Sequence, residues 1–96
     1  MKKRKGFRII ETDGAIHYAL YETIIASVVI KYDTILLFTG GFLTNLTRMV
    51  LNEILEEYSL RYRIIQDNWK WYVQDTTTNN KYRFSEGFTI SLKARK

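Results

Sequence analysis

The sequence contains no cysteine and no proline, and it has a single histidine, His17, among its 96 residues. Without cysteine the fold has no disulfide to stabilise it and no thiolate to bind a metal, as suits a reducing compartment. A serine or cysteine nucleophile needs a base, but His17 lies in a strand-like stretch with no glycine turn beside it. The sequence therefore predicts no catalytic residue and no enzyme.

Metal-binding clusters and long apolar runs are also missing. Glu53, Glu56 and Glu57 form the densest acidic group, yet no aspartate-rich loop is present to complete an oxygen shell for calcium. The longest apolar run, residues 23–30, is far shorter than the roughly 20 residues that span a bilayer. The sequence therefore predicts no metal site, no cofactor and no membrane partner.

Positive charge is concentrated at the two ends of the chain. The formal net charge is +5, from 15 Lys and Arg against 10 Asp and Glu. Residues 2–8 hold five basic groups and residues 93–96 hold three, so residues 9–92 have a charge of 7 − 10 = −3. Short basic tails either solubilise a protein or bind nucleic acid, and both readings stay open. We expect a basic arm over residues 1–6, a single domain over 7–92 and a basic tail over 93–96.

The first part of the chain predicts a hairpin. Residues 7–11 and 15–21 flank an Asp13-Gly14 pair, which favours the positive backbone angles of a tight turn. A helix over residues 15–27 is the rival prediction, because its apolar residues are spaced by four. The turn and the β-branched residues that follow favour the strand.

The next stretch predicts central strands and one helix. In residues 23–30 and 34–38 the side chains that would point to either face of a strand are mostly apolar. This pattern is typical of strands that are covered on both faces, so we expect the two strands to pair at the centre of the sheet. Gly40-Gly41 marks the end of the second of these strands. Thr44 or Asn45 is then the predicted cap of a helix that covers about residues 45–58. Its apolar positions follow the three-and-four spacing of a stripe that packs on a sheet.

The last third predicts a β-meander. Turn-forming residues separate four strand candidates at residues 61–66, 69–74, 81–84 and 88–92. Strands, one helix and more strands make the fold class α+β, with an antiparallel and strongly curved sheet, or half-barrel, and a single packed helix.

Side-chain alternation gives the meander one apolar side and one basic side. The apolar side holds Tyr62, Ile64, Trp69, Trp71, Val73, Tyr82 and Phe84, and the basic side holds Arg61, Arg63, Lys70, Tyr72, Lys81 and Arg83. If the strands pair so that their basic residues lie on the same face of the sheet, five positive charges surround Tyr72 with no acid among them. Such a face can follow a phosphate backbone and stack a base, although basic residues also coat the outer face of many sheets.

The acidic group on the helix predicts a basic neighbour. Glu53, Glu56 and Glu57 lie near the carboxyl end of the predicted helix, where negative charge opposes the helix dipole by a few tenths of a kcal/mol each. A nearby cation would offset this effect. One of the two basic ends of the chain is the obvious source.

Several short motifs between residues 21 and 90 carry a resemblance. Gly40-Gly41-Phe42 leads into Thr44 and Thr47, followed by a helix with Asn52. Further motifs are Ile65-Gln66, Trp71-Tyr72-Val73, Phe84 and Glu86-Gly87. This pattern resembles small, functionally uncharacterised proteins encoded by bacteriophages. The resemblance implies a fold but no activity, and the basic tails and the Trp69-Lys70-Trp71 doublet depart from the pattern.

Two functions of different classes follow from these observations. In the first, a non-enzymatic phage protein binds nucleic acid through the basic side of the meander, with Lys2, Lys3, Arg4 and Lys5 as a clamp. In the second, the chain is an inhibitor or modulator of a host or defence protein, using the helix acids or Tyr18 and Tyr21. Either protein would act in the cytoplasm of an infected host cell.

The doubly apolar strands raise a further question about assembly. One helix covers only one face of a sheet, so the second face of residues 23–30 and 34–38 needs other cover. Either the meander folds over this face as a half-barrel, or two copies pack together as a homodimer. The sequence slightly favours the homodimer.

Overall fold

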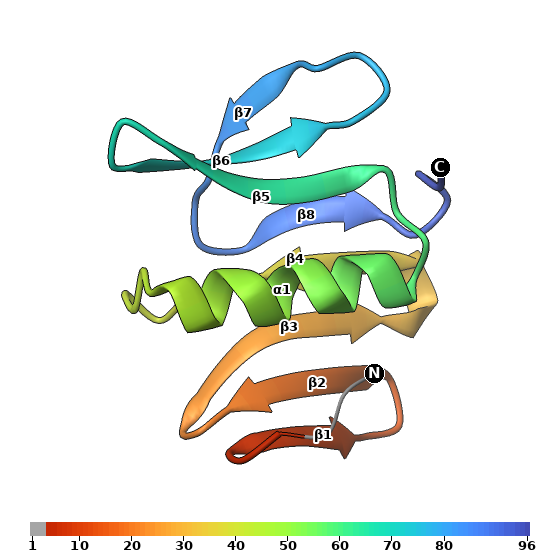
Figure 1. Cartoon of the computed structure of the whole chain (residues 1–96). Helices are drawn as coiled ribbons and strands as arrows, with labels where there is room; N and C mark the ends of the chain where they lie inside the picture. Colours follow the sequence, from red (N-terminus) through yellow and green to blue (C-terminus); the bar gives the residue numbers. More distant parts are fainter. Residues whose placement is uncertain (1–3) are drawn as a thin grey trace.

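The computed structural model describes residues 4–96, which form eight strands, one α-helix and one short 3₁₀ helix (Figure 1). The strands are β1 (Phe7–Glu11), β2 (Ala15–Leu20), β3 (Thr23–Val29), β4 (Thr34–Leu37), β5 (Tyr62–Asp67), β6 (Lys70–Asp75), β7 (Lys81–Arg83) and β8 (Phe88–Ser91). The helices are α1 (Asn45–Glu57) and the 3₁₀ helix η1 (Ile30–Tyr32). The α+β class with a single packed helix is confirmed, and so is the strand after the Asp13-Gly14 turn.

The strands form two antiparallel sheets. One has the order β1-β2-β3-β4-β8 and the other has the order β5-β6-β7. β3 and β4 pair as expected, from Ala26 opposite Leu37 to Val29 opposite Thr34. β8 departs from the predicted meander, because it pairs with β4 instead of β7. Turn residues mark where a strand ends, but they do not specify which strand lies beside it.

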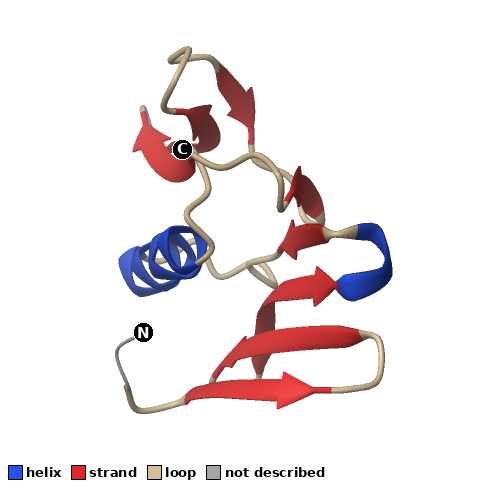
Figure 2. Cartoon of the chain, turned by 90° about the vertical axis from the view of Figure 1, so that its right-hand side faces the viewer, coloured by secondary structure: helices blue, strands red, loops and turns tan. Residues whose placement is uncertain are grey.

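Both sheets curve around α1, so the helix faces the core from the concave side (Figures 1 and 2). Four apolar side chains of α1 are at most 1% exposed, namely Val50, Leu51, Ile54 and Leu55. The same core cluster takes Ile35 and Leu37 from the five-stranded sheet and Ile64, Trp71 and Val73 from the three-stranded sheet. The predicted apolar stripe of α1 therefore packs against both sheets at once. No helix in the described part of the chain has the length and apolar character required to cross a membrane.

The convex face of the five-stranded sheet carries mostly small or half-buried side chains. His17 lies opposite Ser27, and its Nδ1 is 2.7 Å from the Ser27 hydroxyl. Within residues 4–96, no other layer covers this face, since β5, β6 and β7 form a separate sheet (Figure 2) whose buried residues Ile64, Trp71 and Val73 belong to the same core cluster as the helix. The meander therefore does not cover the second face, and the homodimer that would bury it stays a prediction.

Thr44 begins the helix and Asn52 attaches it to the smaller sheet. The Thr44 side chain accepts a hydrogen bond of 3.1 Å from the N–H of Thr47, as expected of an N-cap. Asn52 Nδ2 donates to the carbonyl of Ile64 at 3.0 Å, and Asn52 Oδ1 accepts from the N–H of Ile64 at 2.7 Å. The Asn52 amide thereby pairs with backbone N–H and C=O groups on the edge of β5 that does not face β6, as a further strand would.

Glu86, in the turn before β8, forms hydrogen bonds with the segment that follows β4. Its Oε1 accepts from the N–H groups of Thr39 and Gly40, both at 2.8 Å, and its Oε2 accepts from the Thr39 hydroxyl at 2.7 Å. Burial raises the pKa of Glu86, but these donors outweigh that effect and hold the pKa below its usual range. Gly40 adopts a φ of 63°, and a Cβ there would lie 2.7 Å from the methyl group of Thr23. The turn before β8 is thus fastened to the segment after β4.

Replacing Asn52 with alanine tests the attachment of α1 to β5. Asn52→Ala leaves the buried N–H and C=O of Ile64 without partners, so we expect the free energy of unfolding to fall by about 1–3 kcal/mol. The measurement is urea unfolding at constant m-value. Asn45→Ala, on the exposed start of the same helix, should change stability by less than about 0.5 kcal/mol. Equal effects of the two variants would contradict this role of Asn52.

Glu86 predicts a pH dependence of stability. Its pKa is lowered in the folded protein, so its contribution is present above the unfolded-state pKa of about 4.3 and is lost as the pH falls through the lower folded-state value. At pH 7 we expect Glu86→Gln to reduce the unfolding free energy by about 1 kcal/mol, a figure discounted for exposure. Below the folded-state pKa the difference should disappear. Glu22→Gln, at an exposed turn, is the control, and a pH-independent effect of Glu86→Gln would refute the assignment.

Candidate nucleic-acid interface

The outer face of β5, β6 and β7 gathers four basic residues around one tyrosine. In antiparallel strands, paired residues lie on the same face. Arg63 pairs with Gln74, which pairs with Lys81, while Tyr72 pairs with Arg83 and Lys70 with Asp67. All four cations, Arg63, Lys70, Lys81 and Arg83, are exposed. We call these four residues, with Tyr72, the basic face.

Tyr72 holds two of these cations in place. Lys81 Nζ lies 4.8 Å from the centroid of the Tyr72 ring, and the guanidinium carbon of Arg83 lies 6.0 Å from it. Both distances fall within the range of cation–π attraction. Tyr72 is half-buried beneath these groups, so it orients cations and does not offer an open ring.

One acid lies on the basic face, contrary to the expectation of none. Asp67 pairs with Lys70 across the hairpin, and its Oδ2 is 3.0 Å from Lys81 Nζ. Turn-forming residues predicted that the strand ends at residue 66, but β5 extends through Asp67. The net charge of the basic face is therefore 4 − 1 = +3.

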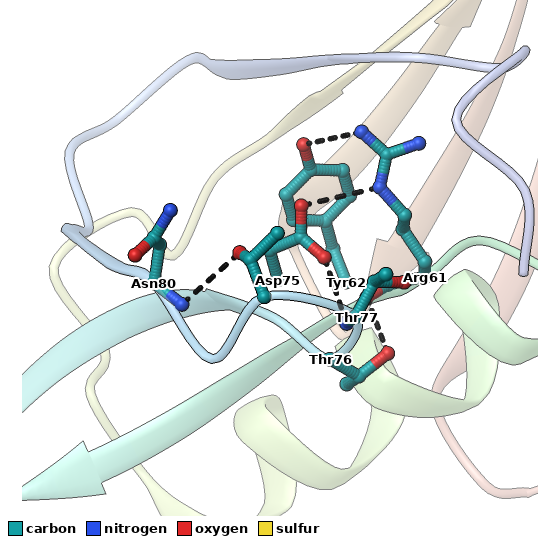
Figure 3. A network of polar contacts seen from close by, with 7 residues as sticks. Arg61, Tyr62, Asp75, Thr76, Thr77 and Asn80 are labelled. Atoms are coloured by element: carbon teal, nitrogen blue, oxygen red, sulfur yellow. Dashed lines mark hydrogen bonds and ion pairs between the residues drawn. The ribbon is translucent and has the colours of Figure 1, made fainter.

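Strand alternation predicted Arg61 on the basic side, but its side chain points to Asp75 and Tyr62 instead (Figure 3). Its Nε donates to Asp75 Oδ2 at 3.2 Å and its Nη2 to the Tyr62 hydroxyl at 3.4 Å. Burial raises the pKa of Asp75, but the N–H of Thr77 and the guanidinium of Arg61 reverse the effect and lower it. Arg61 precedes β5, so strand alternation does not fix its direction, and the buried Asp75 carboxylate attracts it.

Both basic ends of the chain meet the acidic face of α1. Arg4 Nη2 lies 2.6 Å from Glu53 Oε1, and Lys96 Nζ lies 2.7 Å from Glu56 Oε2. The predicted basic neighbour of the helix acids is thus confirmed, with one cation from each end. Arg4 is therefore engaged within the protein. Lys5 is exposed, and Lys2 and Lys3 lie outside the described residues.

Trp69 and Tyr82 do not lie in the core as the alternation suggested. Trp69 is 87% exposed in the turn between β5 and β6, whereas Trp71 is 4% exposed and packs edge-on against Phe84 at 6.0 Å. Tyr82 is also exposed. A break in alternation at the Asp67-Asn68 turn was the only sequence signal that could have removed Trp69 from the apolar side.

The residues expected to serve a protein partner are largely engaged. Tyr18 is buried, and burial together with a hydrogen bond between its hydroxyl and that of Tyr58 raises its pKa. Glu53 and Glu56 form the ion pairs described above. Tyr21, in contrast, is half exposed. Within residues 4–96, no three His, Asp or Glu side chains gather closely enough to hold a metal ion.

Comparison with known proteins places the chain in a family. A search of curated proteins and a search of solved structures each found no match. The family model described as the Kyanoviridae Gp96 protein matches residues 6–91, which is nearly the whole chain. The resemblance to small bacteriophage-encoded proteins is therefore confirmed. The chain belongs to the Kyanoviridae Gp96 protein family, a family of bacteriophage proteins.

Proposed function

We propose that this phage protein is a non-enzymatic accessory protein that binds nucleic acid through its basic face in the cytoplasm of an infected host cell. The observation that carries the proposal is the gathering of Arg63, Lys70, Lys81 and Arg83 on one exposed sheet surface with a single acid. Cations clustered in this way neutralise successive phosphates and release the counterions bound to them.

The arrangement of the cations also supports contact with a phosphate backbone. Arg63 and Lys81 lie in one cross-strand row and Arg83 lies in the next, so the charges spread over all three strands. Because Tyr72 already positions Lys81 and Arg83, these two side chains lose less freedom when they bind a phosphate. The exposed Lys5, with Lys2 and Lys3, remains the proposed clamp.

The hollow beside α1 is a less suitable surface for nucleic acid. It has a volume of about 810 Å³ and runs between α1 and β5. Glu53 and Glu56 line it together with Arg48, Arg63 and Lys96, so acids and bases are mixed there. The electrostatic attraction for a polyanion is therefore weaker at this hollow than on the basic face.

Salt dependence tests the proposal. A fluorescent oligothymidylate of about 16 nucleotides, followed by anisotropy, should bind at low salt with a slope of about −3 or steeper in log affinity against log salt concentration. The four phosphate contacts of the basic face supply about −3 at roughly 0.7 each, and contacts of the clamp would add to it. The variant Lys81→Gln with Arg83→Gln should bind more weakly and reduce the slope by about 1.4. Both cations are exposed, so the variant should fold normally.

A matched control separates the basic face from net charge. Arg8→Gln with Lys31→Gln removes one arginine and one lysine from exposed sites on β1 and η1 and should leave the salt slope unchanged. If the two double variants weaken binding equally, the effect comes from net charge and the basic face is not the site. Absence of binding to single- or double-stranded DNA and RNA at low salt would refute the proposed function.

A second candidate, a modulator of a host or defence protein, is favoured by one apolar surface. Tyr21, Phe42 and Leu43 are exposed, and Tyr21 and Phe42 line a mainly apolar hollow of about 380 Å³ between β2, β3 and the start of α1. A partner with an apolar anchor residue would fill such a hollow.

The two candidates differ in a nuclease-treated pull-down from host lysate. A protein partner of the apolar surface should survive nuclease digestion, should bind the Lys81→Gln, Arg83→Gln variant and should be lost with Phe42→Ser combined with Leu43→Ser. A partner lost on digestion would be bridged by nucleic acid, and that result would remove the support for the second candidate.

A further inference from the structure

Trp69 is an aromatic side chain with no role in the core. It is the most exposed of the large apolar residues in the described part of the chain, at the tip of the β5–β6 hairpin. Trp71, two residues later, supplies the buried tryptophan that packs on Phe84. Exposing a whole indole to water stabilises nothing in the isolated protein. Its place at a hairpin tip beside the basic face suggests a ligand.

The backbone at Trp69 is also unfavourable for a tryptophan. Asn68 and Trp69 form a two-residue turn with φ values of 52° and 67°. Hairpin turns with two positive φ values prefer Asn-Gly, because glycine has no Cβ to clash in this conformation. Asn68 fits this preference and Trp69 does not. Strain of this kind that the fold itself does not require is characteristic of functional sites.

Positive and polar groups surround the indole. Arg48 of α1 forms a shallow recess with Gln66, Asn68 and Trp69. Arg48 Nη1 donates to Gln66 Oε1 at 2.6 Å, and Arg48 Nη2 donates to Asn45 Oδ1 at 3.0 Å, so the guanidinium is fixed on the helix side of the turn. Lys70 follows Trp69 on the basic face. The exposed indole therefore shares a recess with a cation of α1, and the next residue along the chain belongs to the basic face.

We propose that Trp69 stacks on an unpaired base and that the nucleic acid bound is single-stranded. This inference rests on the proposed function and specifies its ligand. In a duplex the bases already stack on one another, whereas a single strand presents their faces to aromatic side chains. Tyr72 does not serve this purpose, because Lys81 and Arg83 lie over its ring. The basic face contacts the phosphates and Trp69 contacts a base.

Two variants at Trp69 isolate stacking from folding. Trp69→Gly removes the ring and supplies the residue that the turn prefers, so its thermal stability should equal or exceed that of the wild type. Trp69→Phe keeps a smaller ring. We expect Trp69→Gly to bind the oligothymidylate at least fivefold more weakly, since each stacked base contributes roughly 1–3 kcal/mol. Trp69→Phe should lie between Trp69→Gly and the wild type, and affinity for a duplex should not change.

A second readout and a control come from other aromatic residues. Because Trp71 is buried, the fluorescence that the oligothymidylate quenches should come from Trp69 and should be absent in Trp69→Phe. Tyr32→Ala removes an exposed ring that also lies beside a lysine, Lys31, in η1 at the opposite end of the sheets (Figure 1). This control should leave affinity for the single strand unchanged.

The outcomes distinguish the inference from the proposed function. Loss of affinity for the single strand alone in Trp69→Gly supports the inference. Unchanged affinity in Trp69→Gly, with weaker binding by Lys81→Gln and Arg83→Gln, overturns the stacking role and leaves the proposed function in place. Equal weakening for single strand and duplex overturns the specificity for single strands. If the wild type binds neither at low salt, the proposed function itself fails.

Discussion

The apolar stripe of α1 must be buried against two sheets at once, and much of the fold depends on this constraint. A lone helix beside a flat five-stranded sheet would leave half of its surface in water. Curvature of the larger sheet and attachment of the smaller one enclose the stripe, so that Leu51 and Ile54 are completely buried. β8 contributes Ile90 to the same core by joining β4. The three-stranded sheet is thereby left with an outer face that no element of the described chain covers.

The short motifs of the phage pattern correspond mainly to contacts that hold this arrangement together. Thr44 caps the helix, Asn52 closes the free edge of β5, and Glu86 fastens its turn to Thr39 and Gly40. Each contact satisfies backbone groups that would otherwise lack partners. These residues therefore describe a fold, which explains why the pattern by itself implies no activity. Apart from Tyr72, the proposed interface lies on residues that the pattern leaves out.

The positive charge of the chain is divided between internal and external roles. Arg4 and Lys96 neutralise acids of α1, and Arg61 neutralises Asp75. The net charge of +5 therefore overstates the positive charge that is accessible to a polyanion. The positions of the cations matter more for binding than the net charge of the chain. The cations that remain on the basic face are the ones whose strands point them away from the core. Together with Trp69 they form the surface on which the proposed function rests.

The sequence by itself determined the local elements. The Asp13-Gly14 turn, the stripe of α1 and the alternation in β5 and β6 depend on neighbouring residues, so their signals lie within a few positions of each other. The tertiary structure alone decided the partner of β8, the direction of Arg61 and the exposure of Trp69. Edge pairing and the attraction of a buried carboxylate depend on groups that are distant in the chain, and the exposure of Trp69 depends on which two residues form the turn between β5 and β6. Local periodicity carries no information about such distant groups, and only the folded chain brings them together.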